Sequence, residues 1–343
     1  MSRALVFALP AGSSEISGGN LYNQQLLAAL TRAGAVSTLS IAECLARVAL
    51  GAPGVYFIDS LDLEAFADFP AQRPGQYFGL IVHHLPSLEP GVAPDHPALA
   101  LERALLPRFD LFLVTSPFTA DVLRARGLAG ARILTVPPAP PPPLSAARAE
   151  PSAPFTFAMI GNLIPRKGVL ALLEALASQM RDTDQFQLEL AGRSDIDRDY
   201  AGSCLKLAQT PKLRSIVRYL GTVPHAQIAE CYGRAVAVVS ASSMETFGMA
   251  LQEARAHGVP ILALDGGYAR QHFTPGANGL LFESVPALAH ELLALSREPS
   301  RLQTLFRTAQ RSRADSEYTW QAAAESFAEQ LANYLTARAE RNA

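Results

Sequence analysis

The sequence predicts an α/β protein of two domains, each with a parallel β-sheet that helices cover on both faces. Three observations favour this fold. The chain has 343 residues, which exceeds the size at which a single hydrophobic core usually stops growing. Apolar runs alternate with helix-like runs in both halves, as expected for strands that are buried on both faces. A proline-rich segment, residues 136–143, separates the halves and can continue neither a helix nor a central strand.

In the first half, four apolar runs are predicted to be strands. They are the run before Pro10 and residues 55–58, 77–82 and 111–114. A glycine-containing loop follows the first run and leads into a helix predicted over residues 21–33. Tyr22 and Leu26 lie about one turn apart on the apolar face of this helix, and Gly34 suits its C-terminal end.

In the second half, six further strands and two clear helices are predicted. The strands are residues 155–160, 186–191, 217–220, 236–239, 260–263 and 279–282, and the helices are residues 169–180 and 318–334. The second of these helices is amphipathic, with Trp320 and Phe327 among its apolar residues. The predicted boundaries are 1–140 for the first domain, 141–154 for the linker, 155–317 for the second domain and 318–343 for a closing helix.

Two glutamates separated by seven residues form the most informative motif. Glu245 lies in a loop after a predicted strand, and Glu253 lies inside the helix that should begin near Phe247 or Gly248. The N–H groups at the start of such a helix favour an anion such as phosphate. One carboxylate can then meet a sugar and the other a ribose. The same residues also fit an ordinary strand-loop-helix turn with solvated glutamates.

A second motif, Gly161 to Gly168, also follows a strand and precedes a helix. Arg166 and Lys167 are adjacent cations in this loop, and they can stabilise the negative charge of a departing diphosphate. Lys167 is one of only three lysines in the chain. The alternative to a diphosphate-binding loop is an ordinary solvent-exposed turn that happens to carry basic residues.

Weaker signals lie at other strand ends. Gly18 and Gly19 occupy the first strand-to-helix turn, where glycines allow a ligand to approach the backbone. His83 and His84 end the strand over residues 77–82, and adjacent residues of an extended chain point to opposite sides, so only one should face a ligand. Each of the two predicted α/β domains should bind ligands at the carboxyl ends of its strands. We therefore expect a cleft between the domains, and the chemistry should take place there.

These motifs resemble those of the family 4 retaining glycosyltransferases, also called glycosyltransferase group 1. The resemblance rests on Glu245-Thr-Phe-Gly248, then Glu253-Ala, on Gly258-Val-Pro260 and on Gly266-Gly267, and it covers almost the whole chain. It implies the GT-B fold, in which two Rossmann-like domains face each other and a C-terminal helix crosses back to the first domain. It also implies hexosyl transfer with retention, without a metal ion or another cofactor.

The resemblance assigns roles to individual residues. It places His83 beside the donor sugar, Glu245 on the sugar hydroxyls, and Arg166 and Lys167 on the diphosphate, as the four catalytic residues. The residues implied in donor or nucleotide binding are Gly18, Gly19, Gly161, Asn162, Gly192, Arg193, Val223, Thr246, Phe247, Gly248 and Glu253. Glu253 would accept hydrogen bonds from the ribose hydroxyls.

Three positions depart from the family pattern. Asn162 replaces an arginine, and Arg166 is the residue that could supply the missing charge. His84 stands where an aspartate is common. No glutamate follows Gly266-Gly267 closely, which leaves the donor sugar open. The spaced carboxylates Asp195, Asp197 and Asp199 are not read as a metal site, because Mg²⁺ sites need phosphate partners and a defined geometry.

Charge and composition limit the partners. The net charge of −2 argues against nucleic acid, which calls for a basic face. Three cysteines without paired spacing favour a reducing cytoplasm. No apolar stretch reaches the roughly 20 residues that span a bilayer, so membrane contact would be peripheral. The expected partners are a nucleotide sugar and a sugar, polyol or lipid-linked acceptor.

Three alternatives to a transferase stay open at this point. A sugar-nucleotide epimerase could use the same architecture, as could a non-catalytic module that binds sugar nucleotides, and a sugar phosphorylase is the third. A hydrolase is disfavoured, because neither a Ser-His-Asp arrangement nor a recognisable pair of carboxylates across a glycosidic bond is evident.

Overall fold

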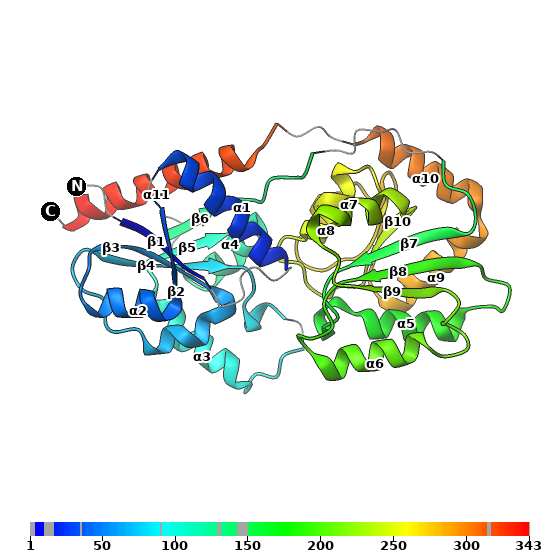
Figure 1. Cartoon of the computed structure of the whole chain (residues 1–343), viewed down its shortest axis with the longest axis horizontal. Coiled ribbons are helices and arrows are strands. Elements are labelled where there is room, and N and C mark those ends of the chain that lie inside the picture. Colours follow the sequence, from blue (N-terminus) through cyan, green and yellow to red (C-terminus); the bar gives the residue numbers. More distant parts are fainter. Residues whose placement is uncertain are drawn as a thin grey trace. The chain divides into compact units, whose positions relative to one another are not determined.

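A computed structural model shows an α/β chain made of two compact units (Figure 1). It describes residues 4–9, 17–34, 36–89, 91–128, 132–142, 150–313 and 317–342. The first unit comprises Met1–Glu15, Gly19–Ala139 and Tyr318–Ala343, and the second comprises Ile16–Gly18 and Pro140–Glu317.

The first unit is built on a six-stranded sheet in which every pairing is parallel. The strand order is β2-β1-β3-β4-β5-β6. The strands are β1 (Ala4–Leu9), β2 (Val36–Ser40), β3 (Gly54–Asp59), β4 (Gln76–Val82), β5 (Leu111–Val114) and β6 (Ile133–Thr135). The central strands β3, β4 and β5 are buried along their whole length, which explains their continuous apolar sequence.

Helices connect these strands. They are α1 (Gly18–Ala33), α2 (Ile41–Ala49), η1 (Ser60–Asp68), η2 (Pro86–Leu88), α3 (Pro97–Leu105), η3 (Leu106–Arg108) and α4 (Pro117–Ala125). The last helix of the chain, α11 (Trp320–Asn342), also packs in this unit and is drawn in red in Figure 1. Phe327 of α11 is fully buried with its ring centroid 6.0 Å from Phe7 and 5.4 Å from Phe57.

The edge strand β6 is covered by α11. The Gln330 side chain accepts a hydrogen bond from the Thr135 N–H at 2.9 Å and donates one to the Thr135 carbonyl at 3.1 Å. An exposed edge strand offers unpaired backbone groups to other chains. Here the side-chain amide of Gln330 pairs with both backbone groups of Thr135.

The second unit has its own six-stranded sheet, also parallel in every pairing. The order is β12-β11-β10-β7-β8-β9. The strands are β7 (Phe155–Ile160), β8 (Phe186–Ala191), β9 (Val217–Gly221), β10 (Ala237–Ser240), β11 (Ile261–Leu264) and β12 (Gly279–Phe282). Numbered within the unit and read from β9, this is the order 3-2-1-4-5-6 of the Rossmann fold.

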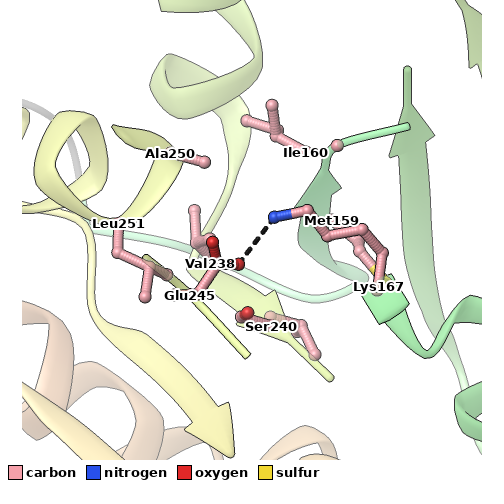
Figure 2. A pocket seen from close by; sticks show the side chains of 10 residues that line it. Met159, Ile160, Lys167, Val238, Ser240, Glu245, Ala250 and Leu251 are labelled. Carbon is pink, nitrogen blue, oxygen red and sulfur yellow. Dashed lines mark hydrogen bonds and ion pairs between the residues drawn. The ribbon is translucent and has the colours of Figure 1, made fainter. Parts of the chain in front are cut away.

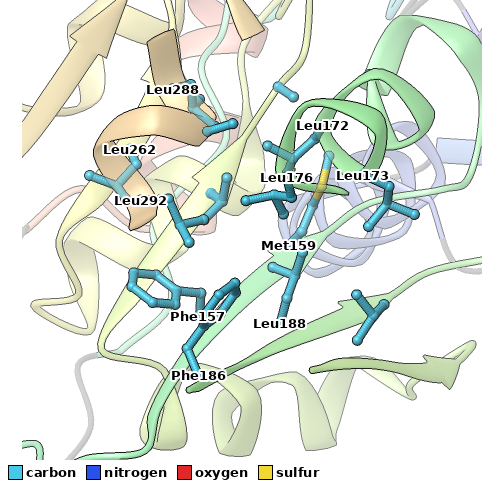
Figure 3. Close-up of a cluster of buried hydrophobic side chains, with 14 of the residues drawn as sticks. Phe157, Met159, Leu172, Leu173, Leu176, Phe186, Leu188, Leu262, Leu288 and Leu292 are labelled. Carbon is cyan, nitrogen blue, oxygen red and sulfur yellow. The ribbon is translucent and has the colours of Figure 1, made fainter. Parts of the chain in front are cut away.

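Alternating side chains of these strands feed two cores on opposite faces of the sheet. Phe157 and Met159 of β7 pack toward α5 and α9, where Figure 3 shows Phe157 beside Phe186 among leucines of both helices. Ala158, between them, faces the core under α7 and α8. The helices of the unit are η5 (Pro165–Lys167), α5 (Val169–Gln179), α6 (Arg198–Ala208), α7 (His225–Arg234), α8 (Met249–Ala256), η6 (Ala269–His272), α9 (Val285–Arg297) and α10 (Pro299–Arg311).

The predicted fold class is confirmed, and two strands were missed. The strand β2 has the sequence Val-Ser-Thr-Leu-Ser and is mostly exposed at a sheet edge, so it has no continuous apolar run. The strand β6 has three residues at the other edge, too few for a pattern. Helix α1 begins at Gly18 rather than at residue 21, because the polar residues before Leu21 are also helical.

The proline-rich segment differs from its expected course over the surface. The described part before residue 143 is irregular, but Pro138 and Ala139 are buried. The Tyr22 hydroxyl donates to the Val136 carbonyl at 2.9 Å, and the Tyr318 hydroxyl donates to the Pro137 carbonyl at 3.3 Å. Two tyrosines therefore hold this stretch against the first unit. Residues 143–149 of the predicted linker lie outside the described residues.

We predict that Phe327→Ala lowers the free energy of unfolding of the first unit by about 3–5 kcal/mol, because it removes a buried aromatic ring and leaves a cavity. Trp320 is the only tryptophan of the chain, and its ring centroid lies 5.6 Å from that of Tyr22 in the first unit. Its fluorescence in a urea titration therefore reports on this unit. The control is Leu50→Ala, at a side chain that is 84% exposed, which should change stability by less than about 0.5 kcal/mol. Equal losses in both variants would contradict the assigned packing.

Candidate functional site

The order of the second sheet places two loops at one edge. Successive connections run outward in opposite directions from β7 and β10, which are neighbours, so the loops after them open side by side at the carboxyl ends of the strands. Ligands of open α/β sheets bind at such a switch point. The loop after β7 carries Lys167, and the loop after β10 carries Glu245.

Lys167 and Glu245 form a buried ion pair at this point. The Lys167 Nζ lies 2.6 Å from the Glu245 Oε1, and the two side chains are 20% and 9% exposed. Figure 2 shows the lysine reaching from the β7 side toward the glutamate across the ends of the strands. Two of the three predicted catalytic residues of this unit are thus in direct contact although 78 positions separate them in the sequence.

The charges around the pair oppose the effect of burial. Burial raises the pKa of Glu245, but the positive charges of Lys167 and Arg166 and the hydrogen bonds from Lys167 and Ser242 outweigh it, so its pKa lies below the ordinary value. Burial lowers the pKa of Lys167, and the Glu245 carboxylate opposes this shift. The site therefore holds an ionised carboxylate against the ammonium group of a lysine.

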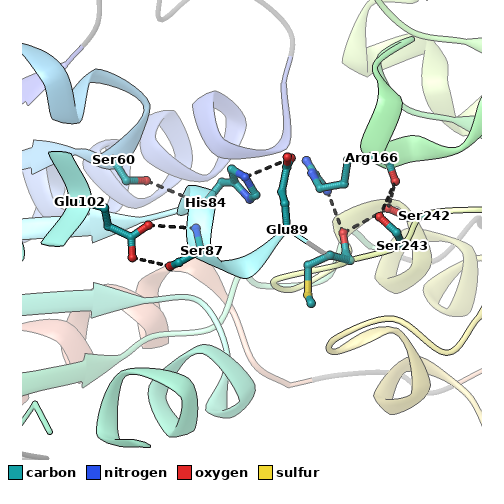
Figure 4. A network of polar contacts seen from close by, with 9 residues as sticks. Ser60, His84, Ser87, Glu89, Glu102, Arg166, Ser242 and Ser243 are labelled. Atoms are coloured by element: carbon teal, nitrogen blue, oxygen red, sulfur yellow. Dashed lines mark hydrogen bonds and ion pairs between the residues drawn. The ribbon is translucent and has the colours of Figure 1, made fainter. Parts of the chain in front are cut away.

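Backbone and side-chain hydrogen bonds fix the two loops to each other. The Arg166 carbonyl accepts from the Ser243 N–H at 3.0 Å, and the Arg166 guanidinium donates to the Met244 carbonyl at 2.8 Å. The Ser242 hydroxyl also donates to the Met244 carbonyl, at 3.1 Å. Figure 4 shows these contacts around Arg166. One N–H donor of the Arg166 guanidinium is thus already bound to the neighbouring loop.

Gly168 lets the first loop turn directly into α5. Its φ of +66° is left-handed, and a Cβ there would collide with the Ala241 carbonyl. Gly192, at the end of β8, similarly lies against the Gly161 carbonyl, where a side chain has no room. Gly168 and the predicted binding residue Gly192 are therefore positions of close backbone approach.

A third loop, after β11, completes the second unit's site. The Tyr268 N–H donates to the Glu245 carbonyl at 2.7 Å, and the Glu245 N–H donates to the Gly266 carbonyl at 3.3 Å. His272 of η6 is buried with its Nε2 2.6 Å from the Phe247 carbonyl, so this nitrogen carries the proton. Burial lowers the pKa of His272, which keeps the ring neutral. Gly266 and Tyr268 thus hold the Glu245 backbone, and His272 holds the Phe247 carbonyl two residues further on.

Helix α8 begins immediately after this loop. Gly248 precedes it with a φ of +92°, and the first helical residue is Met249, one residue after the start predicted near Phe247 or Gly248. Glu253 lies one turn further on, is only 7% exposed and accepts a hydrogen bond from the Tyr232 hydroxyl at 2.8 Å. Burial raises the pKa of Glu253 to about 7, although the tyrosine hydrogen bond opposes the shift. The two glutamates of the motif therefore have pKa values shifted in opposite directions.

A small enclosed space adjoins the ion pair. Its lining includes Gly161, Ser240, Ala250 and the paired side chains (Figure 2). The space is about 10 Å³, room for no more than one water molecule. This cavity is thus not a substrate pocket, and a ligand would lie over the open strand ends.

The remaining predicted residues of the second unit lie at neighbouring strand ends. Asn162 accepts a hydrogen bond from the Arg193 N–H at 3.2 Å, so its amide joins the loops after β7 and β8. The Arg193 guanidinium holds Asp195 through two contacts of 2.9 and 2.8 Å, and this lowers the pKa of Asp195 to about 2. Asp197 caps α6 by accepting from the Tyr200 N–H. Val223 packs against the core under α7 and α8.

The first unit has a polar cluster at its own switch point. Its sheet order reverses between β1 and β3, and Asn23 of α1 and Asp59 of β3 lie there. The Asn23 Nδ2 donates to the Asp59 Oδ2 at 2.5 Å, and its Oδ1 lies 2.9 Å from the His83 Nε2. The amide nitrogen faces the carboxylate, so its oxygen accepts the His83 proton. The chain of hydrogen bonds from Asp59 through Asn23 to His83 therefore fixes the histidine as the Nε2–H tautomer.

His83 is held in a neutral form. Burial lowers its pKa, while the Asp59 carboxylate 3.5 Å from its Nε2 opposes the shift. Its ring packs against Gly19, where an added Cβ would approach ring carbons to 3.0 Å, so two predicted residues are brought together. His84 points elsewhere and its Nε2 lies 3.2 Å from the Glu89 Oε1. The Ser60 hydroxyl accepts from the N–H groups of both histidines at 3.0 and 3.3 Å, and Figure 4 shows the latter contact.

Sequence reasoning missed four residues of these clusters. They are Asn23, Asp59, Tyr232 and His272. Asp59 gave a signal, because a carboxylate directly follows the apolar run of β3. Asn23, Tyr232 and His272 gave none, since each is defined by a partner 21 or more positions away.

Over the residues that the structure describes, no three His, Cys, Asp or Glu side chains gather in a way that could hold a metal ion. Over the same residues, none of the helices combines the length and apolar character needed to cross a membrane.

The fold is shared with solved glycosyltransferases. Residues 143–313 match the family model described as "Glycosyl transferases group 1" and therefore belong to this family, which confirms the resemblance seen in the sequence. The D-inositol 3-phosphate glycosyltransferase 1 of Catenulispora acidiphila is 31% identical over 248 residues, which are 66% of this chain and 58% of the relative.

Solved structures share the fold over nearly the whole chain. The sucrose-phosphate synthase of Thermosynechococcus elongatus has a TM-score of 0.76 at 23% identity and covers 97% of this chain and 100% of its own. Alr3699/HepE of Anabaena, in complex with UDP-glucose, has a TM-score of 0.72 at 16% identity and covers 96% and 99%. These likenesses confirm the predicted GT-B fold class.

The sequence matches are shorter than the curated relatives themselves. The chain spans 14%, 31% and 58% of the length of relatives that it matches. The residues that match the family model, 143–313, all belong to the second unit.

We predict that the stability of the second unit falls as pH rises from about 4.5 to 7, because folded Glu253 holds its proton more tightly than the unfolded residue does. A shift from 4.5 to about 7 corresponds to a loss of about 3 kcal/mol above pH 7. Glu253→Gln keeps an acceptor for Tyr232 and cannot ionise. Its stability relative to the wild type should therefore rise by this amount between pH 4 and pH 8.

Urea titrations followed by circular dichroism measure this difference, and Trp320 fluorescence identifies the transition of the first unit. The matched control is Glu329→Gln, at an exposed position of α11, which should give a pH-independent difference. A flat difference for Glu253→Gln as well would show that folding does not raise the pKa of Glu253, and it would contradict the prediction.

Proposed function

We propose that this protein is a retaining glycosyltransferase that transfers a hexosyl group from a nucleoside-diphosphate sugar to an acceptor hydroxyl. The observation that carries the proposal is the buried pair of Lys167 and Glu245 at the switch point of the second sheet. An ammonium group, a carboxylate and the start of a helix there suit a ligand with both a diphosphate and sugar hydroxyls.

Lys167 is proposed to stabilise the leaving diphosphate. Negative charge accumulates on the phosphate oxygens as the bond to the sugar breaks, and a cation that is already fixed needs no reorganisation at that moment. The contact with Glu245 at 2.6 Å fixes the lysine before a donor arrives. Arg166, held by the Met244 carbonyl, adds positive charge to the same loop. The N–H groups near Thr246, Phe247 and Gly248 are proposed to complete the diphosphate site.

The two glutamates are proposed to bind different parts of the donor. Glu245 is ionised and lies at the strand ends, where it can accept hydrogen bonds from sugar hydroxyls. Glu253 lies one turn into α8, and a carboxylate there can accept from both ribose hydroxyls. The UDP-glucose in the Anabaena structure supports a nucleotide sugar as the donor, because the chain shares that fold. Asn162, Gly161, Gly192, Arg193 and Val223 are proposed to line the nucleotide site.

The first unit is proposed to contribute His83. Its neutral ring, fixed as the Nε2–H tautomer by Asn23 and Asp59, is a hydrogen-bonding group without a charge. In the proposed mechanism the acceptor hydroxyl attacks the face from which the diphosphate leaves, and a phosphate oxygen takes the proton. No metal ion or other cofactor is proposed, and the acceptor is proposed to be a sugar, a polyol or a lipid-linked hydroxyl.

A thermal-shift screen against UDP, GDP and ADP tests the donor site. A nucleotide at a hundred times its dissociation constant should raise the free energy of unfolding by about 2.7 kcal/mol. We expect one nucleoside diphosphate to shift the melting temperature, and the shift to shrink in Glu253→Gln. The absence of any shift from all three nucleotides would contradict the proposed donor.

We predict that Lys167→Ala lowers turnover about a hundredfold, or about 3 kcal/mol, because it removes a charge that acts as the bond breaks. The measurement is donor consumption with the nucleotide identified by the screen, and the folded state is checked by circular dichroism. The matched control is Lys206→Ala, at an exposed lysine of α6, which should keep wild-type turnover. Near-normal turnover in folded Lys167→Ala would overturn the assignment.

Product analysis distinguishes the alternatives. Interconversion of free sugar nucleotides without an acceptor would identify an epimerase. Release of a sugar phosphate from phosphate and a glycan would identify a phosphorylase. Tight nucleotide binding without donor consumption across many acceptors would identify a binding module.

A further inference from the structure

A second cavity lies in the first unit, at the opposite edge of its sheet. It opens where β4 and β5 begin, whereas Asp59 and His83 lie at the carboxyl ends of β3 and β4. Its volume of about 500 Å³ is in the range of small-molecule sites. The cavity is lined by Ala71, Gln72, Phe78, Pro107, Arg108, Phe109, Asp110, Arg132 and Arg338.

Three arginines and one aspartate give the lining of this cavity an excess of positive charge. Asp110 is nearly buried, and its carboxylate is already occupied by the fold. Its Oδ2 accepts from the Phe78 N–H at 3.0 Å and from the Gln72 side chain at 2.5 Å. Its Oδ1 lies 3.8 Å from the Arg338 guanidinium, the only one of the three to pair with it among the recorded ion pairs of the described residues. One carboxylate cannot neutralise three guanidinium groups.

Two of the guanidinium groups are held in place by neutral partners. Arg108 lies over the Phe66 ring at 4.7 Å and donates to backbone carbonyls, including that of Phe66 at 3.4 Å. Arg132 lies over the Phe112 ring at 5.5 Å, and its Nε donates to the Asp110 carbonyl at 3.0 Å. Carbonyls and rings orient these side chains but leave their net charges in place. The positive charge is therefore ordered before any ligand binds, which lowers the cost of binding.

The third guanidinium comes from α11. The Arg338 side chain is 43% exposed, so it can turn toward a ligand in the cavity. Guanidinium groups bind phosphate oxygens through paired N–H donors, and three of them around one cavity match a compact dianion better than a carboxylic acid.

We propose that this cavity binds a phosphomonoester group. The site is separate from the proposed donor site, because all of its lining residues belong to the first unit and the cavity opens where β4 and β5 begin. The proposal does not depend on the proposed transferase activity.

Crystals of the full chain soaked with tungstate, an anomalous scatterer that mimics phosphate, test the position directly. We expect an anomalous peak in the cavity within contact of Arg132 and Arg338. Isothermal titration with inorganic phosphate tests the affinity in solution, and Lys167→Ala should bind phosphate in this cavity as the wild type does. A tungstate peak that is absent from the cavity would overturn the proposal.

Charge reversal at Arg338 isolates the contribution of the cavity. We expect Arg338→Glu to weaken phosphate binding about tenfold or more, since it replaces a donor by a like charge. Arg341→Glu changes the net charge equally on the same helix at an exposed residue outside the lining, and it should bind as the wild type does. Equal affinities of these two folded variants would overturn the proposal.

The same chemistry could come from a soluble compound or from a lipid headgroup. Titration with glycerol 3-phosphate probes the first source, and sedimentation with phosphatidylcholine vesicles that contain phosphatidic acid probes the second. Binding that requires Arg338 in either assay supports the proposal and identifies its source. If neither probe binds, or if binding survives Arg338→Glu unchanged, the proposal is wrong.

Discussion

The buried contact between Lys167 and Glu245 is the interaction on which the second unit's site depends. Removing either partner would leave one charge buried without compensation, which is strongly unfavourable. The pair is therefore possible only if the loops after β7 and β10 keep their separation. The backbone hydrogen bonds of Arg166 to Ser243 and of Glu245 to Tyr268 hold these loops in place. The architecture of the sheet makes the pair available, because β7 and β10 are neighbours although two strands separate them in sequence.

The same topology gives the first unit a site of a different electrical character. Its sheet reverses order between β1 and β3, and the polar groups there are an amide, a carboxylate and a neutral imidazole joined by hydrogen bonds. Asp59 is completely buried, and its Oδ1 accepts a hydrogen bond from the Leu61 N–H. Its role is to orient Asn23 and, through it, His83. One unit therefore presents fixed charges at its switch point, and the other presents an oriented hydrogen-bonding ring.

The two glutamates of the second unit show how neighbours decide the state of one side-chain type. Both are 7% exposed. Glu245 has Lys167 and Arg166 beside it, and its pKa is lowered in spite of burial. Within the part of the chain that the structure describes, the Glu253 side chain has only the neutral Tyr232 hydroxyl as a hydrogen-bond partner, so burial prevails and raises its pKa to about 7. Opposite shifts in a pair of like residues are typical of functional sites, where the two groups have different tasks.

The sequence by itself determined the fold class and the loops that carry the site. Buried parallel strands need continuous apolar runs, and the turns after them need glycine where backbones approach closely, as at Gly168 and Gly192. Local pattern therefore found the loops of Lys167, Glu245 and His83, and among the strands it missed the short or exposed edge strands β2 and β6. Tertiary structure alone decided the partners: Asn23 for His83, Tyr232 for Glu253, His272 for the Phe247 carbonyl, and the three arginines of the second cavity. The physical reason is that burial and Coulomb interactions depend on distance in space, which the spacing of residues along the chain does not encode.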